Sequence, residues 1–139
     1  MKLITAIIRP DKVDELVQVL IASRVPGLTV TEVRGFGRQY GRLAAGQAAA
    51  ATGLLPKVRL EIVVLDDDAE MIAEAIAKQA RTETIGDGKI WITPVDGVLR
   101  VRTGERDRAA VRPAGNKSGT EQQSSVPDPI TWPGRERGR

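Results

Sequence analysis

The stretch at residues 81–95 contains a turn that places several chemically useful groups next to one another. Gly86, Asp87, Gly88 and Lys89 come in succession, between a helix-like pattern and an apolar run. Glycines let backbone amides approach an anion closely, and a lysine neutralises the anion's charge. The turn is therefore suited to phosphate, although a glycine-rich hairpin with a solvated lysine is an equally simple interpretation.

Three other points in the sequence carry related chemistry. Residues 35–39 read GFGRQ, Lys57 begins an apolar run, and Arg100 and Arg102 are separated by one residue. If this last stretch is a strand, its alternation places both arginines on one side, where they present a double positive charge. Arginine and lysine bind phosphate through charge-assisted hydrogen bonds, but none of these points is specific alone.

The composition excludes several classes of function. The 139 residues contain no cysteine and no histidine, which removes disulfides, thiolate nucleophiles, zinc-finger ligands and histidine-based triads. No candidate base or nucleophile is visible in the sequence, so we do not expect an enzyme. Any metal would be a hard, oxygen-liganded cation such as magnesium, brought with phosphates. A formal charge of +3 permits nucleic-acid binding without favouring it.

The hydrophobic pattern alternates between strands and helices. Alternating or β-branched runs predict four strands, at residues 3–8, 28–36, 57–65 and 90–95. Asp11 stands at the expected N-cap of a first helix, whose apolar stripe is Val13, Leu16, Val17, Leu20 and Ile21. Residues 66–68 are all aspartates and can cap a second helix, with the stripe Met71, Ile72, Ala75, Ile76 and Ala80.

Two βαβ halves of this kind predict an α+β fold, a ferredoxin-like βαββαβ sandwich with both helices on one face of an antiparallel sheet. The other face also carries aliphatic residues, so we expect another subunit to cover it. Residues 35–56 form a long insertion between the second and third strands, and residues 98–106 are expected to form a short edge strand and turn. The domain is expected to span residues 1–112, with a disordered tail at 113–139. The apolar start is too short to cross a membrane, so we expect a cytoplasmic protein.

Five blocks, in this order and at these intervals, closely resemble the PII signal-transduction proteins: MKLITAIIRPDKVDEL, GLTVTEVRGFGRQYG, LLPKVRLEIVV, ARTETIGDGKIWITPV and VRVRTGER. The resemblance covers residues 1–108. It implies a homotrimer with nucleotide sites in the clefts between subunits, where ATP and ADP compete. It also implies that 2-oxoglutarate joins magnesium-ATP at the base of a long T-loop, here residues 37–56.

The resemblance assigns roles to particular residues of this chain. It implies that the phosphates are held by Gly86, Asp87, Gly88 and Lys89, with Arg100 and Arg102 reaching them from the neighbouring subunit. Nucleotide contacts are also implied for Thr29, Gly37, Arg38 and Gln39. It further implies that Gln39 contacts magnesium and that Lys57 contacts the oxo-acid, with Arg9 close by. Because a carboxylate repels phosphate, we expect Asp87 to fix the turn through backbone amides or to orient Lys89.

The chain departs from the family pattern at two places. The T-loop tip, residues 44–52, has no tyrosine to accept uridylyl transfer, and the single tyrosine, Tyr40, stands at the loop base. Glu83 and Thr84 replace what is often a glycine followed by a charged residue. Glu83 either weakens phosphate binding by repulsion or points to solvent.

Three functions remain open at this stage. The first is a sensor that binds ATP or ADP, with 2-oxoglutarate, and regulates a transporter or enzyme of nitrogen metabolism through the T-loop. The second is a paralogue for bicarbonate uptake or carbon fixation, which senses bicarbonate instead. A ferredoxin-like nucleic-acid binder is weaker, because Phe36 and Trp91 stand at strand ends. Trp132 in the tail is a candidate docking motif.

Overall fold

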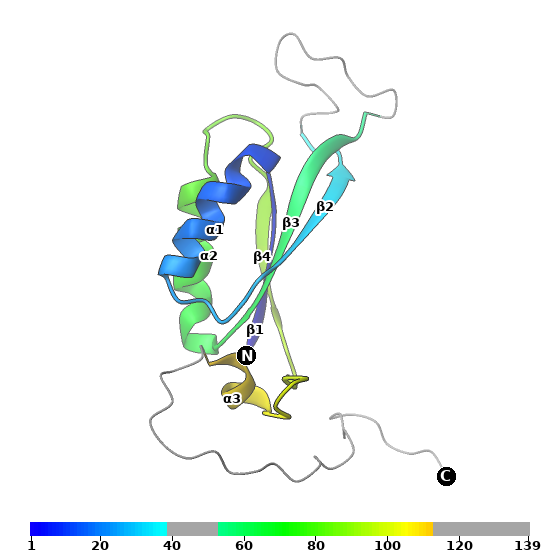
Figure 1. Ribbon diagram of the computed structural model, residues 1–139. Coiled ribbons are helices and arrows are strands. Elements are labelled where there is room, and N and C mark those ends of the chain that lie inside the picture. The colour runs from blue at the N-terminus through cyan, green and yellow to red at the C-terminus, as the bar shows by residue number, and fades with distance from the viewer. Residues whose placement is uncertain (39–52, 113–139) are drawn as a thin grey trace, which may run out of the picture.

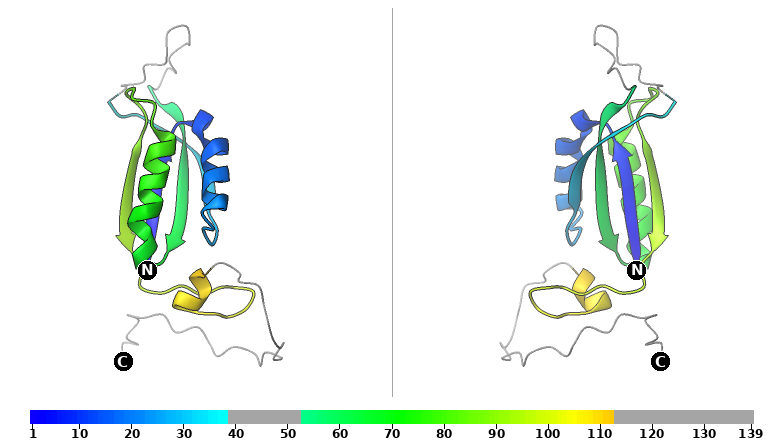
Figure 2. Two further views of the ribbon diagram at one scale, coloured as in Figure 1. Left: turned by 90° about the vertical axis from the view of Figure 1, so that its left-hand side faces the viewer. Right: turned by 90° about the vertical axis from the view of Figure 1, so that its right-hand side faces the viewer.

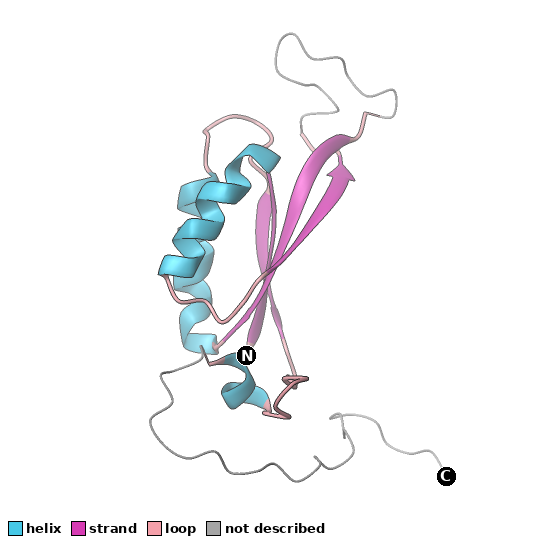
Figure 3. Ribbon diagram, in the orientation of Figure 1, coloured by secondary structure: helices cyan, strands magenta, loops and turns pink. Residues whose placement is uncertain are grey.

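The computed structural model describes residues 1–38 and 53–112 of the chain. Most of the expected T-loop and all of the expected tail lie outside these residues. The elements are shown in Figures 1 and 3. In chain order they are β1 (Lys2–Ile8), the 3-10 turn η1 (Pro10–Lys12), α1 (Val13–Ala22), β2 (Thr29–Gly35), β3 (Leu55–Val64), the 3-10 turn η2 (Asp66–Asp68), α2 (Ala69–Ala80), β4 (Lys89–Pro94) and α3 (Asp107–Val111).

The four strands form one sheet in the order β2-β3-β1-β4, and every neighbouring pair is antiparallel. β1 and β2 therefore run in the same direction with β3 between them, which is the split βαβ arrangement of a ferredoxin-like fold. The register is fixed by pairs such as Ile4 with Ile62 of β3 and Ile92 of β4. The predicted fold class is confirmed.

Both long helices cover one face of the sheet, and the hydrophobic core lies between these layers (Figure 2). Alternate strand residues point to the same face, so Ile4, Ala6 and Ile8 of β1 are buried beside their neighbours on β3. The helices supply Leu16, Leu20, Ile72 and Ile76 to the same core. This burial of aliphatic side chains is the main force that holds the helices on the sheet.

The helical stripes are narrower than the sequence pattern predicts. Leu16, Leu20, Ile72 and Ile76 are buried, whereas Ile21 is 60% exposed and Met71 is 59% exposed. Spacing alone places each of these two residues at the edge of its stripe, but only a narrow seam of each helix touches the sheet. The expectation that Ile21 and Met71 join the buried stripe is wrong.

The expected aspartate caps are also wrong in detail. Asp11 lies inside the turn η1, and neither η1 nor α1 has a side-chain cap hydrogen bond. Asp66, Asp67 and Asp68 likewise form the turn η2 without capping α2 through a side chain. Their negative charges lie near the positive, N-terminal end of the helix dipole, and this placement stabilises the helix.

Within residues 1–38 and 53–112, no helix covers the second face of the sheet (Figure 1). Because residues paired across strands share a face, the register places Leu3, Ile7, Val33, Val63 and Trp91 there. Trp91 is 42% exposed. The prediction that this face also carries apolar residues is confirmed.

The segment after β4 differs from the expected edge strand. Residues 98–106 form a turn closed by a single bridge, between Leu99 and Arg106. The short helix α3 follows, and its Val111 is buried. Asp107 helps to fix this corner, because its carboxylate accepts a hydrogen bond from the Val98 amide at 3.3 Å. No helix within residues 1–38 and 53–112 is long and apolar enough to cross a membrane.

Candidate functional site

The topology brings distant sequence blocks to one end of the sheet. β1 and β2 end there, at Ile8 and Gly35, while the antiparallel strands β3 and β4 begin there, at Leu55 and Lys89. The turn between α2 and β4 lies at the same end (Figure 1). The fold thus explains why the GFGRQ, Lys57 and GDGK blocks, far apart in sequence, are neighbours in space.

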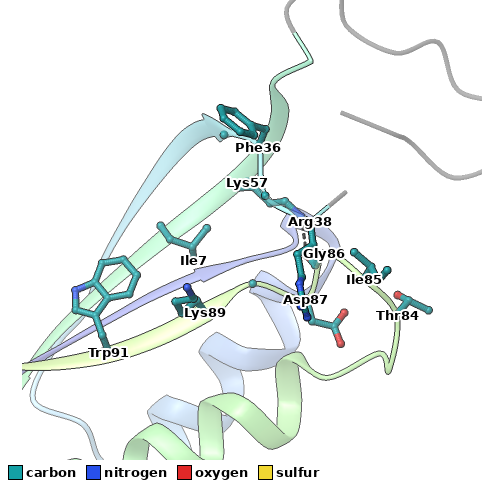
Figure 4. Close-up of a pocket in the computed structure, with 13 residues that line it drawn as sticks. Ile7, Phe36, Arg38, Lys57, Thr84, Ile85, Gly86, Asp87, Lys89 and Trp91 are labelled. Carbon is teal, nitrogen blue, oxygen red and sulfur yellow. Dashed lines mark hydrogen bonds between the residues drawn. The ribbon is translucent and has the colours of Figure 1, made fainter. Parts of the chain in front are cut away.

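A cleft of about 720 Å³ opens among these blocks (Figure 4). One wall is the turn at residues 84–89, and the other is the end of β2 at residues 35–38. Ile7, Lys57 and Trp91 complete the lining. The cleft therefore combines glycine-rich backbone and three cationic side chains with an apolar sector.

Asp87 is the centre of the hydrogen bonds that shape the turn. Its carboxylate accepts hydrogen bonds from the amides of Thr82 at 2.7 Å and Glu83 at 3.0 Å. It also accepts one from the Thr82 hydroxyl, and it forms an ion pair with Arg9 at 3.1 Å. The expectation that Asp87 fixes the turn through backbone amides is confirmed.

Arg9 joins the end of β1 to the same turn. Besides Asp87, its guanidinium donates to the Thr84 hydroxyl and to the Ile85 carbonyl oxygen, both at 2.8 Å. Since the Thr82 hydroxyl donates to Asp87, the 2.6 Å contact between the Thr82 and Thr84 hydroxyls has Thr84 as donor. The four side chains therefore form a closed hydrogen-bonded ring.

The backbone of the turn adopts conformations that favour glycine. Gly86 and Gly88 have φ angles of 109° and 102°, and Glu83 has a φ of 61°. Glu83 therefore occupies a left-handed position that costs an ordinary residue about 1–2 kcal/mol. Its side chain is exposed and does not line the cleft. Of the two expectations for Glu83, the solvent-facing one fits.

The ionisation of Asp87 follows from these contacts. Burial raises the pKa of Asp87, but hydrogen bonds from Thr82 and the charge of Arg9 outweigh burial and lower the pKa to about 2. The carboxylate is therefore charged at neutral pH. In Figure 4 it points away from the side of the cleft where Ile7 and Trp91 lie, so its charge does not face that sector.

Lys57 is tied to the turn from the other side. Its ammonium group donates a hydrogen bond of 2.6 Å to the Gly86 carbonyl oxygen. Burial lowers the pKa of Lys57 and the charge of Arg9 lowers it further, while Asp87 and Asp11 act in the opposite direction. Burial is therefore the main cause of the lowered pKa of Lys57.

Lys89 and Arg38 line the cleft from opposite walls. Within residues 1–38 and 53–112, neither side chain forms an ion pair or hydrogen bond. Both are exposed, so they are accessible to an anion that enters from solvent.

A resident metal has no cluster of ligands in the described part of the chain. No group of three or more acidic side chains there is arranged to hold a metal ion, and the Asp87 carboxylate is already engaged by Thr82, Glu83 and Arg9. These residues fit a magnesium ion only if it arrives with phosphate oxygens as ligands. Gln39, the residue expected to contact magnesium, lies outside the described residues.

Two sets of expected site residues lie elsewhere. Arg100 and Arg102 are not on a strand, because residues 101–103 form a turn, so the expected alternation is wrong. Arg100 forms an ion pair with Glu105 at 3.1 Å and donates to the Ala110 and Arg112 carbonyl oxygens. Thr29 lies at the opposite end of β2 from the cleft and lines a separate hollow of about 570 Å³. Arg9, expected close to Lys57 and the oxo-acid, binds the turn through Asp87, Thr84 and Ile85 and does not line the cleft.

The structure adds cleft residues that the sequence did not reveal as a site. Ile7 and Trp91 both line the cleft. The pairing of Ile7 with Lys89 across β1 and β4 cannot be read from sequence. Trp91 had a usable signal, because it follows Lys89 by two residues and so shares its face of the strand.

The fold and the cleft define a ferredoxin-like protein with a glycine-rich, cationic site at one end of its sheet. The family model described as nitrogen regulatory protein P-II matches residues 1–105. The chain therefore belongs to the nitrogen regulatory protein P-II family.

Individual relatives are similar over the same extent. The nitrogen regulatory protein P-II of Cereibacter sphaeroides is 51% identical over 112 residues, which cover 80% of this chain and all of the relative. P-II 2 of Methanothermobacter thermautotrophicus is 50% identical over 112 residues, covering 80% of this chain and 97% of the relative. GlnK of Escherichia coli K12 is 42% identical, with 80% and 100% covered.

Gly88→Ala tests the close approach of the turn to β1. An added Cβ would lie 1.6 Å from the Ile7 carbonyl oxygen, at a φ of 102°. We expect the turn to be displaced and the free energy of unfolding, measured by urea denaturation, to fall by about 2 kcal/mol or more. Gly27→Ala is the matched control, because nothing lies within 4 Å of its added Cβ. Equal effects of the two changes would contradict the close approach.

Asp87→Asn tests the hydrogen-bonded ring through its pH dependence. Because the folded pKa of Asp87 is lowered to about 2, its contribution is present above pH 4 and disappears as the pH falls through 2. At pH 7 we expect the free energy of unfolding to fall by about 1–2 kcal/mol, by urea denaturation at fixed protein concentration. The gap to wild type should close as the pH falls from about 4 to about 2. Asp67→Asn on η2 is the control. A gap that is constant with pH would show that the charge is not responsible.

Proposed function

We propose that this P-II family chain binds ATP or ADP in the cleft, with the phosphates on the turn at residues 86–89. The observation that carries this proposal is the cleft lining, in which glycine-rich backbone lies beside Lys89 and Arg38, and an apolar sector of Ile7 and Trp91 adjoins them. A nucleotide has the matching parts, a multiply charged phosphate chain and a flat, largely apolar base.

The proposed site is completed by a neighbouring subunit. A trimer whose sheets face one another would cover the apolar face that carries Leu3, Val63 and Trp91. It would also bring the hollow around Thr29 of one copy toward the cleft of the next, so that Thr29, Arg100 and Arg102 contact the nucleotide from that side. This explains why these residues lie far from the turn within one chain.

Lys57 supports a second, anionic ligand beside the phosphates. Lys57 lines the cleft beside the turn, and its ammonium charge would attract a carboxylate bound there. We assign this position to 2-oxoglutarate, with magnesium bridging to ATP through Gln39. In this assignment Arg9 does not contact the ligand directly. It holds the turn that binds the phosphates, because it is bound to Asp87, Thr84 and Ile85.

The output of the proposed sensor is regulation without catalysis. The relatives are named nitrogen regulatory proteins, which supports a role in nitrogen metabolism. The loop at residues 37–56 joins the cleft wall at Arg38 directly to β3. Ligands in the cleft would therefore bias this loop, which contacts the target transporter or enzyme.

Isothermal titration calorimetry with ATP, ADP and AMP tests nucleotide binding. We expect saturable binding of ATP and ADP, and Lys89→Ala should weaken it about 10- to 150-fold through loss of a charge-assisted hydrogen bond. Lys78→Ala, an exposed lysine on α2, removes the same charge away from the cleft and should leave affinity unchanged. Absence of any nucleotide binding would sink the proposal.

Adding the second ligand separates the alternatives in the same experiment. Tighter ATP binding with 2-oxoglutarate and magnesium supports nitrogen sensing, whereas a response to bicarbonate alone would move the chain to carbon metabolism. Salt-sensitive binding of RNA in place of nucleotide would favour a nucleic-acid module.

Sedimentation equilibrium tests the proposed assembly. We expect the mass of three chains, and Val63→Asp should shift it to one chain because a charge would be buried in the apolar interface. Ile21→Asp, on the helical side of the molecule and 60% exposed, should keep the mass of three chains. A monomeric wild type at micromolar concentration would contradict the assembly.

A further inference from the structure

A further hollow, distinct from the cleft and from the hollow around Thr29, lies on the helical side of the molecule. It has a volume of about 210 Å³ and lies between the end of α1, the start of α2 and α3. Its apolar lining includes Val25, Leu65, Ile72 and Val111. Met71 stands at the same place with 59% of its surface exposed, so apolar surface remains uncovered there.

The described chain reaches its end beside this hollow. Val111 of α3 lines the hollow and is 4% exposed, and Arg112 is the last residue that the structure describes. The Cereibacter relative is matched over its full length by 112 residues. This chain has 139 residues, so 27 of them have no counterpart in that relative.

The residues beyond Arg112 contain one segment suited to an apolar hollow. Residues 126–133 read VPDPITWP, with Ile130 and Trp132 as the large apolar side chains. A buried tryptophan removes about 150–250 Å² from water. A peptide rich in proline loses less backbone entropy on binding, which lowers the cost of docking.

We propose that residues 126–133 of this chain dock in the hollow between α1, α2 and α3, with Ile130 and Trp132 covering Met71 and Leu65. The docked segment closes apolar surface that is exposed in residues 1–112. It is an added feature of this chain, independent of nucleotide binding.

The charges on the two sides are complementary. Asp68 lies in the lining of the hollow together with Arg24, and Asp67 and Glu70 are exposed beside it, so this surface is acidic overall. Asp66 is exposed there too, but it already forms an ion pair with the Met1 amino group at 2.6 Å. The residues that follow the docking segment are basic overall, with Arg135, Arg137 and Arg139 against Glu136. The attraction between them would orient the segment with its C-terminal end toward η2.

The connection is long enough for the segment to return to its own hollow. Seventeen residues separate Arg112 from Ile130, and an extended chain advances at most about 3.5 Å per residue. A tethered segment meets its site at an effective concentration on the order of millimolar. Even a weak contact is therefore largely formed within one chain.

The indole NMR signals of the full 15N-labelled chain test this proposal. Trp91 and Trp132 are the two tryptophans, and Trp132→Phe assigns their signals. We expect the Trp132 signal to be displaced from its position in a free peptide of residues 126–139. Met71→Asp should return it to the free position, because a charge then stands in the hollow.

Ile21→Asp is the matched control for Met71→Asp. The two side chains are exposed to nearly the same extent, 60% and 59%, but only Met71 lines the hollow. The control should leave the Trp132 signal displaced. A wild-type signal at the free-peptide position, or equal responses to both changes, would overturn the proposal. A signal that returns to the free position on dilution would assign the hollow to the tail of a second copy, which also overturns it.

Discussion

The ion pair between Arg9 and Asp87 is the contact on which the cleft depends. Arg9 extends from the end of β1, and Asp87 lies in the turn before β4, so the pair joins segments 78 residues apart. The same carboxylate holds the amides of Thr82 and Glu83, and Lys57 holds the Gly86 carbonyl oxygen. These contacts keep the positive-φ glycines in place, and without them the turn would lose the shape that lets its backbone face an anion.

The sheet order explains how one end of the molecule became the site. In the order β2-β3-β1-β4, two strands end and two strands begin at the same end of the sheet. Loops and turns from the separate sequence blocks therefore converge there. In the described part of the chain, helices cover one face of this sheet and leave the other face open. Its other face, with Leu3, Val63 and Trp91, retains apolar surface that a family member can use for assembly.

Several local predictions were wrong for a common reason. Asp11 was expected to cap a helix and instead lies within a 3-10 turn, because a capping preference does not fix where the first helical turn begins. Met71 and Ile21 have core spacing but lie at the edges of their helices, 59% and 60% exposed. Arg100 and Arg102 alternate in sequence, but the chain turns between them, and Arg100 binds carbonyl oxygens of the α3 region. In each case the local pattern did not specify what the side chain contacts in the folded chain.

The sequence by itself determined the fold class, the order of strands and helices and the glycine-rich turn, because periodicity and turn chemistry are local properties of the chain. It also carried the blocks that place the chain in the P-II family. Only the tertiary structure decided that Asp87 faces Arg9, that Ile7 and Trp91 line the cleft, and that Thr29 and Arg100 lie away from it. Those facts depend on strand register and on which side chains meet across the fold, and no local pattern specifies a contact between residues far apart in the chain.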